Sequence, residues 1–252
     1  MVTDYIRLEG RVLRCVIATK ANGGTLDVTA TREAAAAISA LASDDSAGCV
    51  LLTGDGPNFC TGGDVTAFAA AQDRGAFVGS MARQFHELIR AIAHTEVPVV
   101  AAVHGWAVGA GMSLVCACDV TVGGPSTRLR PAYPAIGFSP DGGMSWTLPR
   151  IVGIARARDI LLTDRVLAGD EAWRAGLLSR LVPDDQIAAE AGKTAETLAA
   201  GPTSAYRRIK RLLAAAEHDR LDEHLELEAE AIAASADSPA GRAGVDAFAA
   251  RH

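Results

Sequence analysis

Two glycine-rich turns constrain this chain more than any other feature. They are residues 51–65 (LLTGDGPNFCTGGDV) and residues 103–119 (VHGWAVGAGMSLVCACD). Each follows an apolar, β-branched run and leads into a helix-compatible stretch, so each brings bare backbone N–H groups to a helix start, where partial positive charge collects. Glycine lets the backbone approach a ligand closely. Two such N–H groups that converge would stabilise an oxygen that becomes negative during a reaction, which predicts a main-chain oxyanion hole.

The hydrophobic pattern around these turns predicts an α/β fold. Asp27 is a suitable N-cap for an alanine-rich helix over residues 28–41. Further helices are expected over residues 73–94 and 110–118. The predicted strands are residues 5–8, 11–19, 48–53, 97–103 and 119–122. This alternation of strands and helices favours parallel strands.

Beyond Asp141 the pattern becomes helical. The expected helices are residues 142–150, 153–163, 169–175, 184–200, 202–216 and 219–235. The pair Gly201 and Pro202 separates the last two from the rest. We therefore expect a core over residues 1–200 and a C-terminal helical region over residues 201–252, which packs on the core or on a neighbouring subunit.

Composition excludes several classes of function. The chain has 252 residues, of which 49% are hydrophobic and 21% charged, as in soluble globular proteins. Its net charge is −6 and it has no basic block, so nucleic acid is not expected as a partner. There is neither an apolar run as long as a membrane span nor an apolar secretion signal at the N-terminus. A cytoplasmic protein without a membrane partner is expected.

The five cysteines show no metal-binding spacing, so no metal site is expected. Four of them lie in apolar runs, which is typical of reduced, buried thiols. Cys60 lies inside the first glycine turn, but no neighbouring feature marks it as a nucleophile.

Four motifs occur in an order that resembles one family. They are TGDGPNFCTGGDV, PVVAAVHGWAVGAGMSL followed by CD, IGFSPDGG and LPRIVG. From about Arg11 to about Arg211 the chain is similar to the crotonase (enoyl-CoA hydratase/isomerase) superfamily. The resemblance implies a spiral core of ββα units, a helical C-terminal region, and a homotrimer or dimer of trimers. It also implies an acyl-CoA thioester substrate, an anionic thioester intermediate, and no cofactor beyond the coenzyme A of the substrate.

The resemblance also assigns roles to individual residues. By motif position, the N–H groups of Gly63 and Ala110 are the oxyanion donors, and Ala110 opens a helix whose dipole adds to the effect. The backbone of Cys60, Thr61, Gly62 and Asp64 would contact the adenine end of coenzyme A. Two lysines, Lys20 and Lys210, would reach its phosphates.

The catalytic side chains depart from the hydratase pattern. Hydratases of this family carry one glutamate three residues after the second oxyanion donor, where this chain has Ser113. They carry another eight residues before the position of Asp141, where this chain has Tyr133. Adding water to a double bond suits two carboxylates, one to activate water and one to deliver a proton. Ordinary hydratase activity is therefore not expected.

Asp141 is the carboxylate that remains, in the segment GFSPDGG. One interpretation is a helix N-cap, which is a common role for aspartate. The other follows from the resemblance, because single-aspartate isomerases of the superfamily carry their acid/base in a similar PDxGG loop. One carboxylate suffices to remove a proton from the α or γ carbon and return it elsewhere.

Two alternatives stay open. The first is an aryl-CoA dehalogenase or acyl-CoA hydrolase with Asp141 as nucleophile. The 4-chlorobenzoyl-CoA dehalogenases of the superfamily use an aspartate at this position in that way, with a tryptophan where this chain has Tyr133, whose hydroxyl could donate to Asp141 as an indole N–H would. They also carry a histidine twelve residues before the strand proline, and this chain has His86 twelve residues before Pro98. A plain surface histidine is the other interpretation of His86. A second alternative is a relative that binds acyl-CoA without turnover.

Overall fold

The structure is a computed structural model, and it describes residues 4–251. Its core is a six-stranded sheet in the order β1-β2-β3-β4-β6-β9. β1 pairs antiparallel with β2, and the other neighbours pair parallel. The strands are β1 (Ile6–Glu9), β2 (Val12–Ala18), β3 (Cys49–Gly54), β4 (Val99–Val103), β6 (Val120–Gly123) and β9 (Arg180–Leu181). The expected α/β fold with parallel strands is confirmed.

A second, three-stranded sheet was not expected from the sequence. Its order is β5-β7-β8, with β5 (Trp106–Val108), β7 (Arg128–Arg130) and β8 (Leu167–Ala168). Strands of two or three residues carry too little alternation to be recognised in a sequence. β5 lies in the second glycine turn, and Ala107 in β5 forms an isolated parallel bridge with Cys60 in the first turn.

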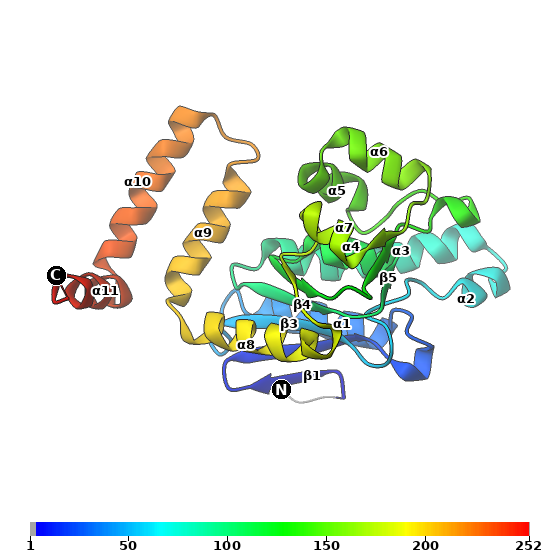
Figure 1. The fold of residues 1–252 in the computed structure, drawn as a ribbon, viewed down its shortest axis with the longest axis horizontal. Coiled ribbons are helices and arrows are strands. Elements are labelled where there is room, and N and C mark those ends of the chain that lie inside the picture. Colours follow the sequence, from blue (N-terminus) through cyan, green and yellow to red (C-terminus); the bar gives the residue numbers. More distant parts are fainter. Residues whose placement is uncertain (1–3, 252) are drawn as a thin grey trace.

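Helices cover both faces of the large sheet (Figure 1). α1 (Val28–Ala40) and α3 (Arg74–His94) pack together on one face. α8 (Ile187–Ala200) covers the other face with small residues. A Cβ on Gly48 would lie 2.7 Å from the carbonyl oxygen of Ala199, so this end of α8 approaches the sheet closely.

The remaining helices follow the expected segments with two additions. α2 and α11 were not expected, and residues 184–186 form a 3₁₀ turn before α8 rather than its first turn. The helices other than α1, α3 and α8 are α2 (Val65–Ala70), α4 (Ala110–Ala117), α5 (Met144–Val152), α6 (Ile154–Leu162), α7 (Gly169–Arg174), α9 (Thr203–Ala215), α10 (Leu221–Asp237) and α11 (Pro239–Ala249). Within residues 4–251, no helix combines the length and apolar character that a membrane span requires.

The C-terminal helices extend to one side of the core (Figure 1). None of α9, α10 and α11 contains a buried residue. α10 packs against α9 and α11. Three ion pairs tie α9 to the edge of the core, namely Arg207–Asp45, Lys210–Asp119 and Arg211–Glu96.

Asp27 caps α1 as predicted. Its Oδ1 accepts from the N–H groups of Thr29 and Ala30, both at 2.9 Å. Its Oδ2 accepts from Nδ2 of Asn22 at 2.7 Å, and the side chain is buried. Asp27 therefore joins the turn after β2 to the start of the helix.

We expect Asp27→Ala to lower the free energy of unfolding by about 2 kcal/mol, because a helix cap and a buried hydrogen bond are lost together. Urea denaturation followed by circular dichroism measures the change. Asp73→Ala is the matched control, since Asp73 caps α3 from an exposed position. An equal loss in both variants would contradict this account of Asp27.

Candidate active site

The two glycine turns meet at the carboxyl ends of β3 and β4. The N–H of Cys60 donates to the carbonyl oxygen of Trp106 at 3.1 Å, and the N–H of Val108 donates to the carbonyl oxygen of Cys60 at 2.8 Å. A Cβ on Gly111 would lie 2.3 Å from that Cys60 oxygen, so only glycine permits this contact. The turns are thus joined backbone to backbone.

This contact brings together the two N–H groups predicted to form the oxyanion hole. Gly62 has φ +91°, and a Cβ there would lie 2.9 Å from the carbonyl oxygen of Val108 and 3.8 Å from the nitrogen of Ala110. Ala110 is the first residue of α4, after Gly109 at φ +54°. Within residues 4–251, the N–H groups of Gly63 and Ala110 donate to no protein acceptor. Both are therefore available to a ligand oxygen.

Asp141 lies on a turn that packs against α4. Gly142 has φ +61°, and a Cβ there would lie 2.3 Å from Cε1 of Phe85 and 2.8 Å from Cβ of Ser113. α5 begins only at Met144, and its N-cap, Gly143, makes no side-chain cap. The N-cap interpretation of Asp141 is therefore wrong, since the helix begins too far along the chain, and the carboxylate is free for another role.

Neutral hydroxyls hold Asp141 in place. The Oη of Tyr133 donates to Oδ1 of Asp141 at 2.8 Å. The Oγ of Ser113 donates to the backbone oxygen of Asp141 at 3.0 Å and lies 3.2 Å from the Tyr133 Oη. The positions where hydratases carry glutamates thus contain a buried hydroxyl pair that binds the one aspartate.

The Tyr133 hydroxyl remains a hydrogen-bond donor at neutral pH. Burial, and then the charge of Asp141, raise the pKa of Tyr133 above its ordinary value. A raised pKa keeps the phenol protonated over a wider range of pH. Its hydrogen bond to Asp141 therefore persists wherever Asp141 is ionised.

His86 in α3 faces the same turn. The N–H of Gly142 donates to Nε2 of His86 at 3.1 Å. Since Nε2 is the acceptor, the neutral ring carries its proton on Nδ1. The plain surface interpretation of His86 is wrong, because the imidazole binds the residue next to Asp141.

The residues predicted to bind coenzyme A are only partly available. The N–H of Thr61 already donates to the carbonyl oxygen of Gly24 at 2.8 Å. The N–H of Cys60 likewise donates to the carbonyl oxygen of Trp106. The carboxylate of Asp64 caps α2 by accepting from the N–H groups of Thr66 and Ala67. Lys20 is exposed near the first turn, with its Nζ 3.7 Å from Asp55.

Lys210 does not join this site within the chain. Its Nζ donates to Oδ2 of Asp119 at 2.7 Å and to the carbonyl oxygen of Val97 at 3.1 Å. Asp119 directly precedes β6 and Val97 lies two residues before β4, so both partners lie at the amino ends of these strands, whereas the glycine turns follow the carboxyl ends of β3 and β4. Within one chain the Lys210 ammonium therefore lies at the opposite edge of the sheet from the glycine turns.

The cysteines are buried thiols, apart from the half-buried Cys118. Burial raises the pKa of Cys60 to about 12. Its thiol therefore stays protonated at neutral pH and lacks the thiolate character of a nucleophile.

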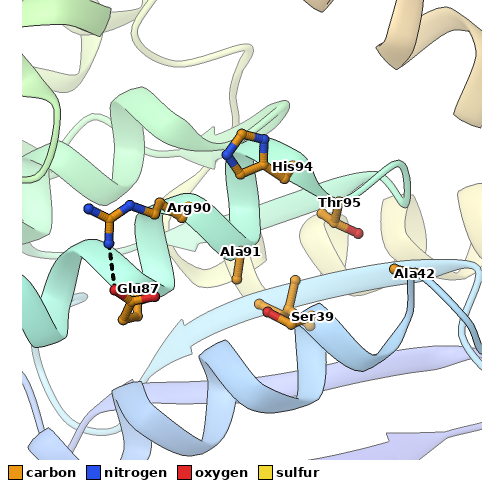
Figure 2. A pocket seen from close by; sticks show the side chains of 8 residues that line it. Ser39, Ala42, Glu87, Arg90, Ala91, His94 and Thr95 are labelled. Carbon is orange, nitrogen blue, oxygen red and sulfur yellow. Dashed lines mark hydrogen bonds and ion pairs between the residues drawn. The ribbon is translucent and has the colours of Figure 1, made fainter.

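Three phenylalanines near the site were not singled out by the sequence. They are Phe68, Phe77 and Phe138, and the ring of Phe68 contacts the rings of the other two. A separate shallow pocket lies between α1 and α3 (Figure 2), with Ser39, Glu87 and His94 in its lining. It includes none of the residues around Asp141.

An α/β core whose two glycine turns are joined backbone to backbone, followed by a helical C-terminal region, is the crotonase fold, and solved structures of that fold superpose on this chain. The model of the enoyl-CoA hydratase/isomerase family matches residues 14–252. The chain belongs to the enoyl-CoA hydratase/isomerase family.

Individual relatives cover several reactions. The chain is 34% identical over 201 residues to a 4-chlorobenzoyl coenzyme A dehalogenase of Arthrobacter, which covers 79% of this chain and 73% of the relative. It is 35% identical over 213 residues to the 1,2-epoxyphenylacetyl-CoA isomerase of Escherichia coli, covering 82% and 80%. The crystal structure of an enoyl-CoA hydratase from Polaromonas superposes with a TM-score of 0.89 at 28% identity, covering 98% of this chain and 96% of that one.

The position of Lys210 predicts a structural effect. Lys210→Met should increase hydrogen exchange in α9 severalfold, because α9 loses an ion pair to the core. The affinity for an acyl-CoA ester should stay within about twofold, and calorimetry measures it. A large loss of affinity with unchanged exchange in α9 would restore the coenzyme A assignment.

Because its pKa is raised, Tyr133 should not ionise in the pH range where an ordinary tyrosine does. Between about pH 9 and 11, where an ordinary tyrosine ionises, the native protein and Tyr133→Phe should show equal increases in tyrosinate absorbance. If Tyr133→Phe lost a third or more of the native increase, Tyr133 would titrate normally, because the chain contains three tyrosines and the charge of Asp27 raises the pKa of Tyr5.

Proposed function

We propose that this chain is an enoyl-CoA isomerase that uses Asp141 as its acid/base. The carboxylate removes a proton from the α or γ carbon of the thioester, and the C–H electron pair moves into the conjugated system to give a dienolate. The N–H groups of Gly63 and Ala110 bind the thioester oxygen. Asp141 then returns the same proton to the other carbon, so the double bond moves without any cofactor.

The observation that carries this proposal is the connection between the carboxylate and the oxyanion pair. Ser113 lies one helical turn after Ala110 in α4, and its hydroxyl binds the backbone of Asp141. Asp141 and one oxyanion donor are therefore positioned by the same helix. Each backbone donor contributes about 3 kcal/mol to transition-state stabilisation in such sites.

The absence of a second carboxylate at Ser113 and Tyr133 supports isomerisation over hydration. A glutamate in place of Ser113 would need space that the Asp141 turn occupies, since Ser113 is fully buried and its Oγ lies 3.0 Å from the backbone oxygen of Asp141. The site is built around a neutral residue there. Rapid hydration of crotonyl-CoA by the native protein would count against this interpretation.

We also propose an acyl-CoA ester as the substrate and a homotrimer or dimer of trimers as the assembly. An acyl-CoA ester is consistent with family membership and with two relatives whose names specify coenzyme A esters. Lys20, exposed beside the first turn, is the candidate for a phosphate contact. The unburied faces of α9, α10 and α11 support packing against neighbouring subunits in a trimer or dimer of trimers.

A dehalogenase or hydrolase with Asp141 as nucleophile is the second candidate. It is favoured by the Arthrobacter relative and by the position of His86 beside Asp141. A histidine base for ester hydrolysis must accept a proton from water, yet His86 Nε2 already accepts from the Gly142 N–H. This occupation favours isomerisation. A covalent adduct on Asp141 after incubation with 4-chlorobenzoyl-CoA, detected by mass spectrometry, would reverse the preference.

Asp141→Asn tests the proposed acid/base. The native protein should convert 3-enoyl-CoA to 2-enoyl-CoA, and the variant should lose about 10³-fold in kcat, because an amide cannot carry the proton. The affinity for a saturated acyl-CoA should remain within about threefold. Full activity in Asp141→Asn would refute the assignment.

His86 variants separate positioning from proton transfer. His86→Gln should keep kcat within about threefold, since an amide oxygen can still accept from the Gly142 N–H. His86→Leu should lose about tenfold or more, because the turn that holds Asp141 loses its acceptor. If both variants lost activity equally, the imidazole itself would be required and the hydrolytic candidate would gain support.

A further inference from the structure

Three phenylalanine rings from separate segments form one cluster, which we call the aromatic wall. Phe68 in α2 and Phe77 in α3 pack edge to face with ring centroids 6.3 Å apart. Phe68 and Phe138 stack, also at 6.3 Å, with an interplanar angle of 26°. Phe138 precedes Asp141 by three residues in the segment GFSPDGG.

The aromatic wall contacts both the first glycine turn and the turn that carries Asp141. The Cζ of Phe68 is 2.6 Å from where a Cβ on Gly63 would lie, so this ring packs directly against Gly63. The N–H of Phe138 donates to the carbonyl oxygen of Tyr133 at 2.9 Å, and the Tyr133 side chain binds Asp141. Phe68 therefore contacts the first glycine turn, and Phe138 belongs to the turn that carries Asp141.

These rings are not part of the hydrophobic core. Phe77 is 37% exposed and Phe138 is 40% exposed, while α2, which carries Phe68, has no buried residue. Core phenylalanines such as Phe59 are fully buried. A contiguous aromatic surface beside a reactive site is typical of a ligand contact rather than of structural packing.

We propose that the aromatic wall is the acyl-group subsite and that it selects ring-bearing acyl groups over saturated chains of equal carbon number. Aromatic rings attract other rings through their quadrupoles, in offset or edge-to-face contacts, beyond the effect of buried area. An aryl group next to the thioester carbonyl would meet Phe68 and Phe138 while its carbonyl oxygen binds Gly63 and Ala110. This inference rests on the proposed function only for the placement of that carbonyl.

Binding of two unreactive esters tests the subsite. Phenylacetyl-CoA and octanoyl-CoA both carry eight acyl carbons, and isothermal titration calorimetry measures their dissociation constants. Apolar burial alone favours the longer saturated chain. We expect phenylacetyl-CoA to bind about fivefold more tightly than octanoyl-CoA. Equal affinities, or tighter octanoyl-CoA, would overturn the proposal.

Two variants locate the effect. Phe138→Leu and Phe68→Leu should each weaken phenylacetyl-CoA by about fivefold and leave octanoyl-CoA within about twofold. Phe248→Leu is the control, because Phe248 lies in α11 and is 61% exposed. Unchanged phenylacetyl-CoA affinity in both wall variants, with native circular dichroism, would also overturn the proposal.

Binding and activity measurements distinguish the aromatic subsite from the proposed isomerisation. If phenylacetyl-CoA is preferred but no enoyl ester is isomerised, the subsite is supported and the proposed reaction is refuted. If Asp141-dependent isomerisation is observed without a preference for the ring, the reaction is supported and the subsite is refuted.

Discussion

The close approach of the two glycine turns is the contact on which the rest of the site depends. Cys60 and Ala107 bridge as parallel strands do, and Gly111 leaves the space that the Cys60 carbonyl oxygen occupies. This backbone contact places the Gly63 and Ala110 N–H groups together without any side-chain ligand. Donors fixed in this way need little reorganisation during a reaction, which is why main-chain oxyanion holes are effective.

Around that contact, neutral groups position a single charge. Tyr133 donates to the carboxylate of Asp141, Ser113 donates to its backbone oxygen, and His86 accepts from the N–H of Gly142. Buried polar groups are stable only when they are hydrogen-bonded, so the three side chains specify one arrangement of the turn. The contacts of Ser113 and His86 thereby hold the turn that carries Asp141 against α4 and α3.

The sequence predicted those helices and strands that are long enough to show a clear hydrophobic period or that begin with a capping residue. Asp27 and α1 were predicted because a cap and an alanine-rich helix are encoded by neighbouring residues. β5 and β7 were missed because three-residue strands form only when distant partners supply their hydrogen bonds. The ion pair of Lys210 was not predicted for a similar reason, since its partner Asp119 is far away in sequence and only the fold decides which end of the sheet α9 meets.

The residue patterns alone predicted the chemical groups of the site: two glycine turns that expose N–H groups, one aspartate in a PDGG turn, and serine and tyrosine where hydratases carry glutamates. How those groups are connected follows from the packing of the core. The tertiary structure showed that Tyr133 donates to Asp141, that His86 binds the adjacent turn, and that Phe68, Phe77 and Phe138 form one wall. These contacts join segments separated along the chain, so their geometry follows from packing of the whole core rather than from any local pattern.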